Sequence, residues 1–569
     1  MENSTIADLF DEIADLLELR QANPFRIRAY RNAARTIRSL PARLEDLAEQ
    51  ENALSGIRNI GESTAEKIIE ILETGTCKRV EELRKKVPAG LPGIMRIPGV
   101  GPKKAMLIHE KLDVNTIEGL QKACEAHKLR ELAGFGKKTE QKILKGIGTV
   151  ESTEGRILYQ EAADHLASLK EHLDGLPGID RWEVAGSFRR GKETIGDLDM
   201  LVRADDRKQA TEAILEYDAI SEVISKGKER VSVRLTGGLQ VDFRFFDESD
   251  FGSALLYFTG SKAHNIEVRR LAQERDWKLN EYGLFSGKRR LAGKTEKAVF
   301  KRLDMRWVPP ELRENRGEIE EARNGHMPRL ITLDDIRGDF QCHTTASDGE
   351  HSIREMAEAA RQRGYDFLAI TDHSKRVTMA NGLDNERAER HADAIRKVDS
   401  DMQRFWLLAG IEVDILKSGK LDLKEKTLAK LDWVVASIHY DRNMSRKKMT
   451  DRLIAAVKSG VVHCLGHPLG RIIGKRDPIA VDLDKIIEAC VDHNVCLEIN
   501  CQPDRLDLPD TLCRDARDAG VMFSLGTDAH STDGFRFMPF GVNVARRGWL
   551  RKGDVLNTKT ITEMKKAIG

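Results

Sequence analysis

Cysteine is scarce in this sequence, and long apolar runs are missing. Only 8 of the 569 residues are cysteine, and their scattered positions lack the spacing of a disulfide framework. No apolar run approaches the roughly 20 residues that a membrane helix needs. The start, Met1 to Thr5, lacks the basic and apolar segments of a signal peptide. A disulfide-stabilised secreted protein is therefore excluded, and we expect a cytoplasmic protein with no membrane partner.

An excess of charge of either sign is also missing. The 93 Lys+Arg against 92 Asp+Glu argue against a uniformly basic nucleic-acid binder, but the balance differs between segments. Residues 101–150 carry 10 basic and 6 acidic residues, 251–300 carry 10 and 5, and 151–250 carry 14 and 22. An acidic block between basic ones suits a divalent-cation site flanked by surfaces that hold a polyanion, although runs of charge are usually solvated faces.

The length requires several domains. A chain of 569 residues exceeds the roughly 250–300 residues that one hydrophobic core supports, so about three to five domains are expected. With 40% hydrophobic and 33% charged residues, the composition is typical of globular proteins.

One short pattern occurs three times in the N-terminal third. Its apolar-x-Gly-apolar-Gly spacing predicts a tight turn whose glycines accept positive φ and leave backbone N–H groups free at the start of the next helix. In the first copy Asn59 replaces the first glycine, which the left-handed region tolerates. Lys103, Lys104, Lys137 and Lys138 follow the later copies. These turns resemble helix-hairpin-helix modules, which hold DNA backbone; the glycines involved are Gly61, Gly99, Gly101, Gly134 and Gly136.

The acidic middle contains a pattern for divalent cations. Asp197 and Asp199 are two residues apart in an expected strand, so both carboxylates point to one face. A third carboxylate, Asp242, is expected on the polar face of the strand around residues 239–245. Shared Mg²⁺ relieves the repulsion between such carboxylates, and two cations can activate a 3′-hydroxyl and stabilise a leaving pyrophosphate. Gly186, Ser187 and Arg190 precede the pair, where they would meet a triphosphate.

The palm residues named above resemble those of the family X DNA polymerases. The resemblance covers roughly residues 1–315 and includes Leu256 to Ser261, His264, Asn265, Arg269 and Leu279 to Tyr282. The resemblance implies that Asp197, Asp199 and Asp242 bind two Mg²⁺ or Mn²⁺ ions. It also implies that Ser187, Arg190 and Gly196 contact the incoming triphosphate, that Tyr257, Phe258 and Gly260 flank the sugar, and that Asn265 meets the nascent base pair.

The same resemblance bears on a second activity. Lys67 falls where family members with lyase activity place the Schiff-base lysine, and Arg26 and Tyr30 fall in the 5′-phosphate pocket. Ser63 and Ser55 stand where those enzymes have lysines, so 5′-deoxyribose phosphate lyase activity is left open.

The C-terminal part is rich in histidine. Nine of the 15 histidines lie beyond residue 335, and most follow apolar strand-like runs separated by helical stretches. A β/α barrel gathers such residues at the carboxyl ends of its strands. Burying six His or Glu strand ends together with Asp348 and Asp528 costs too much without metal, so a metal centre is expected.

This part resembles the polymerase-and-histidinol-phosphatase (PHP) family, distorted barrels that hold two or three divalent metals and hydrolyse phosphoesters. The resemblance implies Mn²⁺ or Zn²⁺ and the ligands His343, Asp348, His373, Glu412, His439, His467, Asp528 and His530. The family opens with His-x-His, whereas here the first member is Gln341, a weaker, uncharged ligand.

The predicted fold is multidomain: an α-helical helix-hairpin-helix region, an α+β nucleotidyltransferase palm with its thumb, and a distorted β/α barrel. We expect a lyase-like domain at 1–85, fingers at 86–150, palm at 151–250, thumb at 251–316, a linker at 317–335 and a PHP domain at 336–569.

We expect a monomeric DNA-directed DNA polymerase that uses deoxynucleoside triphosphates to fill short gaps in gapped or primer-template DNA during repair. Its PHP domain would act as a 3′-5′ exonuclease, with AP endonuclease or 3′-phosphoesterase activity as further options. Two alternatives stay open. One is a DNA-binding repair scaffold with a degenerate barrel, and the other is a palm acting on a non-DNA acceptor beside a phosphatase barrel.

Overall fold

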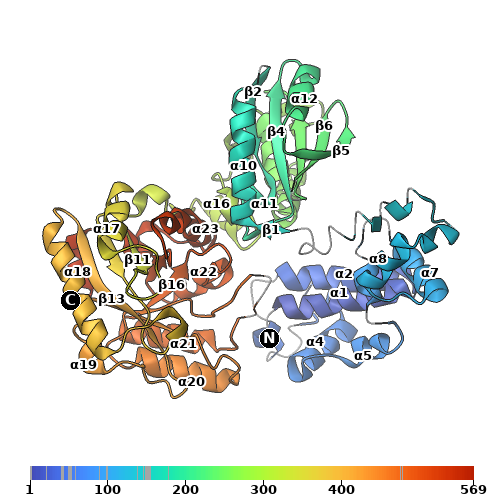
Figure 1. The fold of residues 1–569 in the computed structure, drawn as a ribbon. Helices are drawn as coiled ribbons and strands as arrows, with labels where there is room; N and C mark the ends of the chain where they lie inside the picture. The colour runs from blue at the N-terminus through green and yellow to red at the C-terminus, as the bar shows by residue number, and fades with distance from the viewer. Residues whose placement is uncertain are drawn as a thin grey trace.

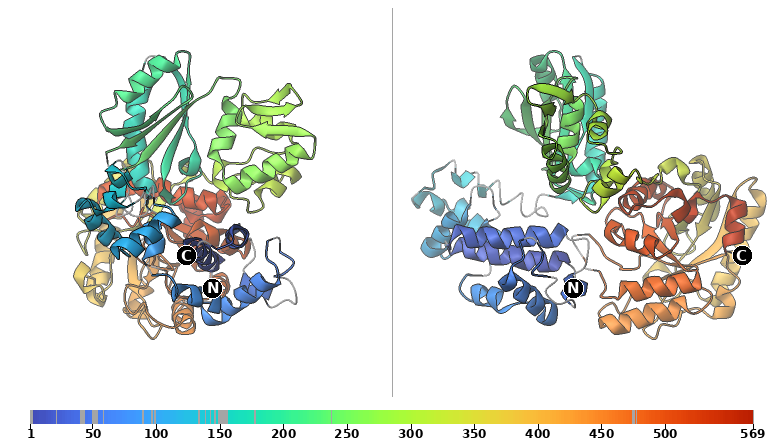
Figure 2. Two further views of the ribbon diagram at one scale, coloured as in Figure 1. Left: turned by 90° about the vertical axis from the view of Figure 1, so that its right-hand side faces the viewer. Right: turned by 180° about the vertical axis from the view of Figure 1, so that it is seen from behind.

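The structure of the protein is a computed structural model. It describes residues 3–568 except 21, 40–43, 49–53, 58, 89, 96, 98–99, 133, 138, 142, 145–146, 148–155, 177, 237, 474–475 and 477. Figures 1 and 2 show the N-terminal helices, the palm with its thumb, and the C-terminal barrel as successive bodies along the chain. Within the described residues, none of the helices combines the length and apolar character needed to cross a membrane.

The N-terminal region is helical. Its first two helices pair because Ile6, Phe10 and Ile13 recur at helical spacing on one side and are fully buried against Ala34 and Ile37. The helices are α1 (Asn3–Leu19), α2 (Pro24–Ser39), α3 (Leu44–Ala48), α4 (Glu62–Thr74), α5 (Lys78–Arg84), α6 (Leu91–Met95), α7 (Pro102–Leu112) and α8 (Ile117–Glu125), followed by the 3-10 turn η1 (Lys128–Glu131).

The predicted tight turns are present where the chain is described. Asn59 has φ 67° and Gly134 has φ 85°, so both occupy the left-handed region expected of the first glycine in the pattern. Gly61 and Gly101 are the N-cap residues of α4 and α7, and neither helix start has a side-chain cap. The first backbone N–H groups of α4, and those that follow Pro102 in α7, therefore have no side-chain acceptor at the cap and can bind an outside acceptor. Gly99 lies outside the described residues.

The palm is built on a five-stranded sheet with the order β2-β4-β7-β6-β5. Leu198, Met200 and Val202 are fully buried, which leaves the alternate positions of β4 to the opposite face. The elements are β1 (Ile157–Leu158), α10 (Tyr159–Asp174), β2 (Ile179–Val184), α11 (Gly186–Arg189), β3 (Thr194–Ile195), β4 (Asp197–Ala204), α12 (Arg207–Leu215), β5 (Ile220–Lys226), β6 (Arg230–Leu235) and β7 (Gln240–Phe245).

The thumb follows without a break. It consists of α13 (Phe251–Thr259), α14 (Lys262–Gln273), the antiparallel strands β8 (Trp277–Asn280), β9 (Gly283–Ser286) and β10 (Arg289–Ala292), α15 (Glu296–Arg302) and the 3-10 turn η3 (Pro310–Leu312).

The expected linker at 317–335 is a packed joint. It contains α16 (Glu318–Asn324) and the 3-10 turn η4 (Leu333–Asp335). Ala322 and Leu330 belong to the hydrophobic cluster of the thumb, to which Trp549 from the C-terminal part also contributes. The segment expected to be a linker therefore packs Ala322 and Leu330 against its neighbours, whereas its Leu333 is exposed.

The C-terminal part is a parallel barrel of seven strands in chain order. Its first and last strands meet: the Asp528 N–H donates to the Gln341 carbonyl at 2.9 Å, and the His343 N–H donates to the Ala529 carbonyl at 2.8 Å. The strands are β11 (Gly338–Cys342), β12 (Phe367–Ile370), β13 (Trp406–Asp414), β14 (Trp433–Ser437), β15 (Cys464–Leu465), β16 (Cys496–Asn500) and β17 (Phe523–Gly526).

Helices cover the outside of the barrel, as Figure 1 shows for α17 to α23. Their bounds are α17 (Ile353–Gln362), α18 (Asn385–Asp401), α19 (Glu425–Leu428), α20 (Arg446–Val457), α21 (Leu483–His493), α22 (Asp510–Asp518), α23 (Met538–Arg547) and α24 (Ile561–Ile568). The parallel β/α alternation brings every strand's carboxyl end to the same face.

Candidate functional site: a palm carboxylate cluster and a barrel metal centre

The three palm carboxylates come together through strand register. Strands β4 and β7 are parallel neighbours, and their pairing places Asp199 opposite Asp242 and Asp197 opposite Gln240. Gly186, at the start of α11, lies against Asp199, whose Oδ2 would be 2.6 Å from a Cβ at that position. A side chain larger than hydrogen would therefore displace this carboxylate.

Arginines divide the cluster electrostatically. Arg230 donates to Asp242 at 2.7 Å and Arg244 at 3.2 Å. Burial would raise the pKa of Asp242, but hydrogen bonds from Ser232, Arg230 and Gln240 outweigh it and lower the pKa. Burial, and then the charge of Asp197, raises the pKa of Asp199 to about 6. Burial and Asp242 likewise raise the pKa of Asp197. Nearby arginines do not outweigh burial and the neighbouring carboxylates at this pair, so its oxygens suit a hard cation such as Mg²⁺.

The predicted triphosphate contacts lie on α11, at its C-cap and directly before β4. The Arg190 guanidinium donates to the Thr259 carbonyl and packs against Gly260, where a Cβ would lie 3.1 Å from Nη1. Gly196 allows a similar approach by Arg156, whose Nη1 would be 3.0 Å from a Cβ there. Ser187 lies in the first turn of α11.

Arg156 was not anticipated. Its Nε donates to Thr194 Oγ1 at 3.0 Å, and its charge acts on Asp197. The only sequence signal was one arginine just before a short strand.

Tyr257 and Asn265 line one small cavity with Arg269 and Asn280. The Asn265 amide donates to the Tyr257 carbonyl at 2.6 Å, which ties α14 to α13. Phe258 lies under Arg244, with the guanidinium 4.4 Å from the ring centroid. The predicted sugar-flanking residues are thus linked to the carboxylates through Arg244.

The predicted 5′-phosphate residues belong to the separate N-terminal helices. Arg26 is exposed in α2, and the Tyr30 ring packs 5.9 Å from Phe10. The Lys67 amine donates to the Ser63 carbonyl at 2.6 Å and to its hydroxyl at 2.8 Å. Ser63 therefore accepts two hydrogen bonds from the Lys67 amine in this structure.

The barrel residues converge at the carboxyl ends of the strands. Donor atoms of His343, Asp348, His373 and His530 all lie within 4.8 Å of one another, and so do those of His373, Glu412 and His439. His373 belongs to both groups. The two remaining predicted ligands are adjacent, since His467 Nε2 lies 2.9 Å from Glu412 Oε1 and His343 Nε2 lies 2.9 Å from Asp528 Oδ1.

Opposite charges within this centre shift its titration. Burial would raise the pKa of Glu412, but His373 and His439 bring it well below its usual range. Although burial lowers it, the pKa of His439 rises to about 10 because of Glu412, and that of His530 rises to about 9 because of Asp348.

The donor geometry fits cations better than hydrogen bonds. His373 Nδ1 lies 2.7 Å from Glu412 Oε2, yet neither atom makes a hydrogen bond of acceptable geometry within the described residues. Buried imidazole and carboxylate donors turned toward a common point are the ligand types of Mn²⁺, Zn²⁺ and related metals.

Gln341 is fully buried beside this centre. It lies against Gly466 and Gly526, and neither of its amide atoms has a hydrogen-bond partner in the described part of the chain.

Several supporting residues carry no metal-ligand signature in the sequence. Asp414 accepts from the His439 N–H at 3.0 Å and lies 3.2 Å from its Nδ1. Asn500, at the end of β16, donates to Asp528 at 3.1 Å, and Glu498 accepts from the His467 N–H at 2.6 Å. Of these residues, only Asp414 could have been suspected from the sequence, because it lies two residues after the predicted ligand Glu412 in the same strand.

Arginines gather beside His467, on loops that follow adjacent strands. The Arg442 guanidinium packs on Gly470. Burial, then Arg476 and Arg505, lower the pKa of Arg442 to about 10, and Asp507 offsets this in part. Burial, and then the charge of Arg505, lower the pKa of His467. Such a concentration of positive charge at the rim suits phosphate groups.

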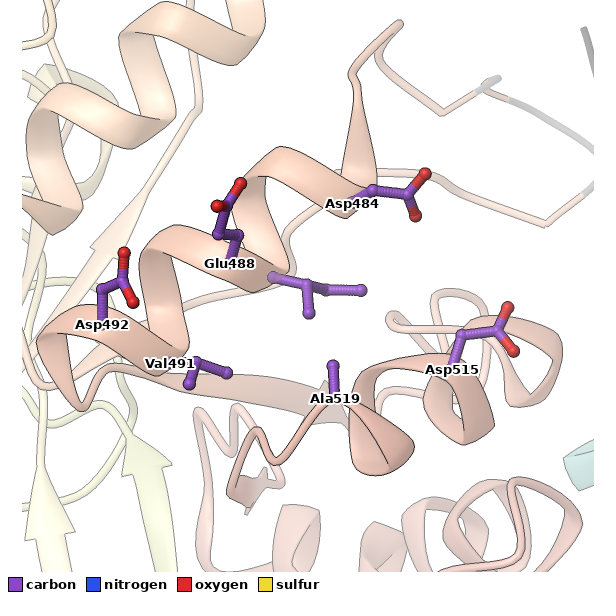
Figure 3. A pocket seen from close by; sticks show the side chains of 7 residues that line it. Asp484, Glu488, Val491, Asp492, Asp515 and Ala519 are labelled. Carbon is purple, nitrogen blue, oxygen red and sulfur yellow. The ribbon is translucent and has the colours of Figure 1, made fainter. Parts of the chain in front are cut away.

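A separate groove lies on the outside of the barrel, between α21 and α22 (Figure 3). It has a volume of about 320 Å³, an apolar lining from Ile487, Val491 and Ala519, and carboxylates on its rim: Asp484, Glu488, Asp492 and Asp515. These carboxylates would repel phosphates, so the groove does not suit a DNA backbone.

Comparison with protein families gives matches along most of the chain. Helix-hairpin-helix domains match residues 1–77, and a SAM-like helix-hairpin-helix tandem matches 93–149. The DNA polymerase beta thumb matches 254–314, and the PHP domain matches 339–502.

Individual relatives agree with this division. Rat DNA polymerase lambda is 27% identical over 49% of this chain and 52% of its own length. A probable phosphatase of Vibrio parahaemolyticus is 28% identical over 40% of this chain and 91% of its own length. The Bacillus subtilis DNA polymerase/3′-5′ exonuclease PolX is 37% identical over 99% of both chains. At that identity over the full length, this chain belongs to the family X DNA polymerases that carry a C-terminal PHP domain.

Proposed function

We propose that this protein is a DNA-directed DNA polymerase that fills short gaps in DNA repair and removes 3′ nucleotides with its barrel. The observation that carries the polymerase half is the register of β4 and β7, which assembles Asp197, Asp199 and Asp242, with Gly186 of α11 against Asp199. The eight converging barrel residues carry the exonuclease half.

In the palm, Asp197, Asp199 and Asp242 would hold two Mg²⁺ or Mn²⁺ ions. When bound, such a pair lowers the pKa of the primer 3′-hydroxyl and stabilises the leaving pyrophosphate. Arg230 has a half-exposed side chain, so it can leave Asp242 without opening the core. Ser187, Arg190, Gly196 and the newly identified Arg156 would hold the triphosphate, which arginine forks bind in bidentate fashion.

The cavity at α13 and α14 would select the nucleotide. Tyr257, Phe258 and Gly260 would flank the sugar and discourage a 2′-hydroxyl, and Asn265 would meet the nascent base pair. The bond from Asn265 to the Tyr257 carbonyl supports this division, because it couples the base contact to the sugar contact.

The N-terminal helices would hold the DNA backbone. The uncapped starts of α4 and α7, behind Gly61 and Gly101, offer backbone N–H groups to phosphates without reading sequence. Gly99, Gly134 and Gly136 would serve the other turns. Lyase chemistry at Lys67, with Arg26 and Tyr30 on the 5′ phosphate, is a secondary proposal that needs Ser63 to release the amine.

In the barrel, His343, Asp348, His373, Glu412, His439, His467, Asp528 and His530 would hold two or three Mn²⁺ or Zn²⁺ ions, with Gln341 as a weak further ligand. Bound metals supply a hydroxide nucleophile and polarise the phosphodiester. Arg442, Arg476 and Arg505 would grip phosphates of the strand being shortened. The degenerate-barrel alternative loses support, since the predicted ligand side chains are gathered at one place.

Separate inactivation of the two centres tests this proposal. On a 5′-labelled gapped duplex with Mg²⁺ or Mn²⁺, Asp197→Ala should abolish extension and retain shortening, because only the palm cluster loses a ligand. His343→Ala should do the reverse. Normal extension by Asp197→Ala would refute the palm assignment.

A further inference from the structure

Helix α23 of the barrel reaches the loop of the palm that carries Arg190. Figure 1 shows α23 on the side of the barrel that lies nearest to α16 and α11. The Arg547 side chain is 3% exposed, and its guanidinium donates to the Arg190 carbonyl at 2.6 Å and to Glu314 Oε1 at 3.1 Å. It also contacts Asp510 at 2.8 Å.

One helix face makes this contact. Phe540, Asn543 and Arg547 are three and four residues apart, so they project from the same side of α23. Asn543 lies against Gly191, where a Cβ would be 3.5 Å from the Asn543 Cβ. The Phe540 ring lies 5.8 Å from Tyr159, which in turn stacks at 4.6 Å on Phe188 of α11. The loop that carries Arg190 is therefore supported along its length.

Glu314 is shared between two arginines. Its Oε1 accepts from Arg190 Nε at 3.1 Å and from Arg547 Nη1 at 3.1 Å. Three more charged side chains lie nearby. Lys192 and Asp510 interact electrostatically with Arg547, and Arg316 interacts with each of these two side chains. A triphosphate that recruits Arg190 must take it from Glu314, which would leave a buried carboxylate unpaired unless another cation stays beside it.

We infer that Arg547 is a positioning residue for nucleotide addition: it keeps Glu314 paired when Arg190 turns to the incoming triphosphate, so that nucleotide binding in the palm depends on the barrel. This inference rests on the proposed role of Arg190. Arg547 touches neither nucleotide nor metal, and it acts through Arg190 and Glu314.

The test is steady-state extension of a one-nucleotide gap by the full chain. Arg547→Ala should raise the KM for the incoming nucleotide about tenfold, the cost of one charge-assisted hydrogen bond, with a smaller change in kcat. Shortening of labelled DNA should stay at the wild-type rate. Arg551→Ala is the matched control, because Arg551 follows the same helix and pairs on the surface with Asp554.

A second substitution separates positioning from structural damage. In the Arg547→Ala background, Glu314→Gln should restore most of the nucleotide KM, because the uncharged amide no longer holds Arg190. If Arg547→Ala is too unstable to assay, Asn543→Ala should give a weaker rise in KM on the same loop.

These variants distinguish the positioning role of Arg547 from the triphosphate role of Arg190. If Arg190→Ala raises the nucleotide KM but Arg547→Ala and Asn543→Ala leave it unchanged, the inference is overturned and the proposed function stands. Failure of Glu314→Gln to restore the KM would also overturn it. If Arg190→Ala leaves the KM unchanged, the proposed triphosphate role itself is wrong.

Discussion

At the scale of single residues, burial and neighbouring charges explain which palm carboxylates have a raised pKa and therefore favour a bound cation. Asp242 is satisfied by Arg230 and Arg244, whereas Asp199 lies close to Asp197 with a more distant arginine, 3.7 Å from its Oδ1. Burial, and then the charge of Asp197, raises the pKa of Asp199 to about 6, from an ordinary value of 3.8. In the metal-free protein this carboxylate is a source of instability at neutral pH.

Asp199→Asn should therefore stabilise the metal-free protein. A pKa raised on folding means that the stabilising protonated state is present at low pH and is lost as the pH rises through about 6. The gain should be small at pH 4 and reach about 1 to 3 kcal/mol at pH 8, raising the melting temperature by a few degrees. Thermal unfolding in a chelator at both pH values measures it.

Asp205→Asn provides the control, because Asp205 is 84% exposed at the end of the same strand. An equal gain for Asp199→Asn at pH 4 and pH 8 would show that the buried charge of Asp199 is not the cause.

His439 illustrates how a ligand is held by its neighbour. Asp414 is fully buried and bonds both the backbone and the ring of His439. Asp414→Asn should weaken metal binding in the barrel about 10- to 100-fold and reduce DNA shortening, while extension continues. Metal titration of the full chain measures the change. Arg376 contacts both Asp414, at 2.8 Å, and the exposed Asp441, at 2.7 Å. Asp441→Asn, which loses only an Arg376 contact, should leave metal affinity unaltered.

Most candidate site residues could be predicted because their chemistry is visible in short patterns. The alternation of β4 points Asp197 and Asp199 the same way, and histidines after apolar runs mark strand ends. Arg156, Asp414 and Asn500 could not be found in this way. Their roles depend on which strand lies next to which, and an isolated Arg, Asp or Asn carries no such information.

At the scale of elements, the largest difference concerns residues 317–335. Their polar composition predicted a linker, but α16 and the following turn bury Ala322 and Leu330 together with Trp549. Similarly, the strand-end histidines pointed to six barrel strands, and β16 was missed because it ends in Asn500 with no histidine. Amphipathic partners far apart in the chain cannot be recognised from local patterns.

Trp549→Ala tests whether the 317–335 segment is a packed joint. Trp549 is 4% exposed in the thumb cluster, so truncation should destabilise the protein by about 3 to 5 kcal/mol. Thermal unfolding should show an earlier first transition, and limited proteolysis should cut near α16. Leu333→Ala, at an exposed residue of the same segment, is the control. Equal thermal stability and equal proteolysis of the two variants would show that residues 317–335 do not form a packed joint.

At the scale of the whole molecule, the near-neutral charge sum results from cancellation between basic and acidic segments. The palm and the barrel are also joined through buried charges, since Arg547 meets the Arg190 carbonyl across 357 positions of sequence. The fold of each part could be predicted from its motifs. The contact between the parts could not, because it depends on the surfaces that the finished domains present.

The central claim is that two separate centres act in opposite directions on the same primer end. It is tested most directly with a 5′-labelled gapped duplex whose primer ends in a mismatch, supplied with all four deoxynucleoside triphosphates. The wild type should remove the mismatch and then extend, Asp197→Ala should only shorten the primer, and His343→Ala should leave the mismatch in place. If His343→Ala removed the mismatch as fast as the wild type, the assignment of the exonuclease to the barrel would be contradicted.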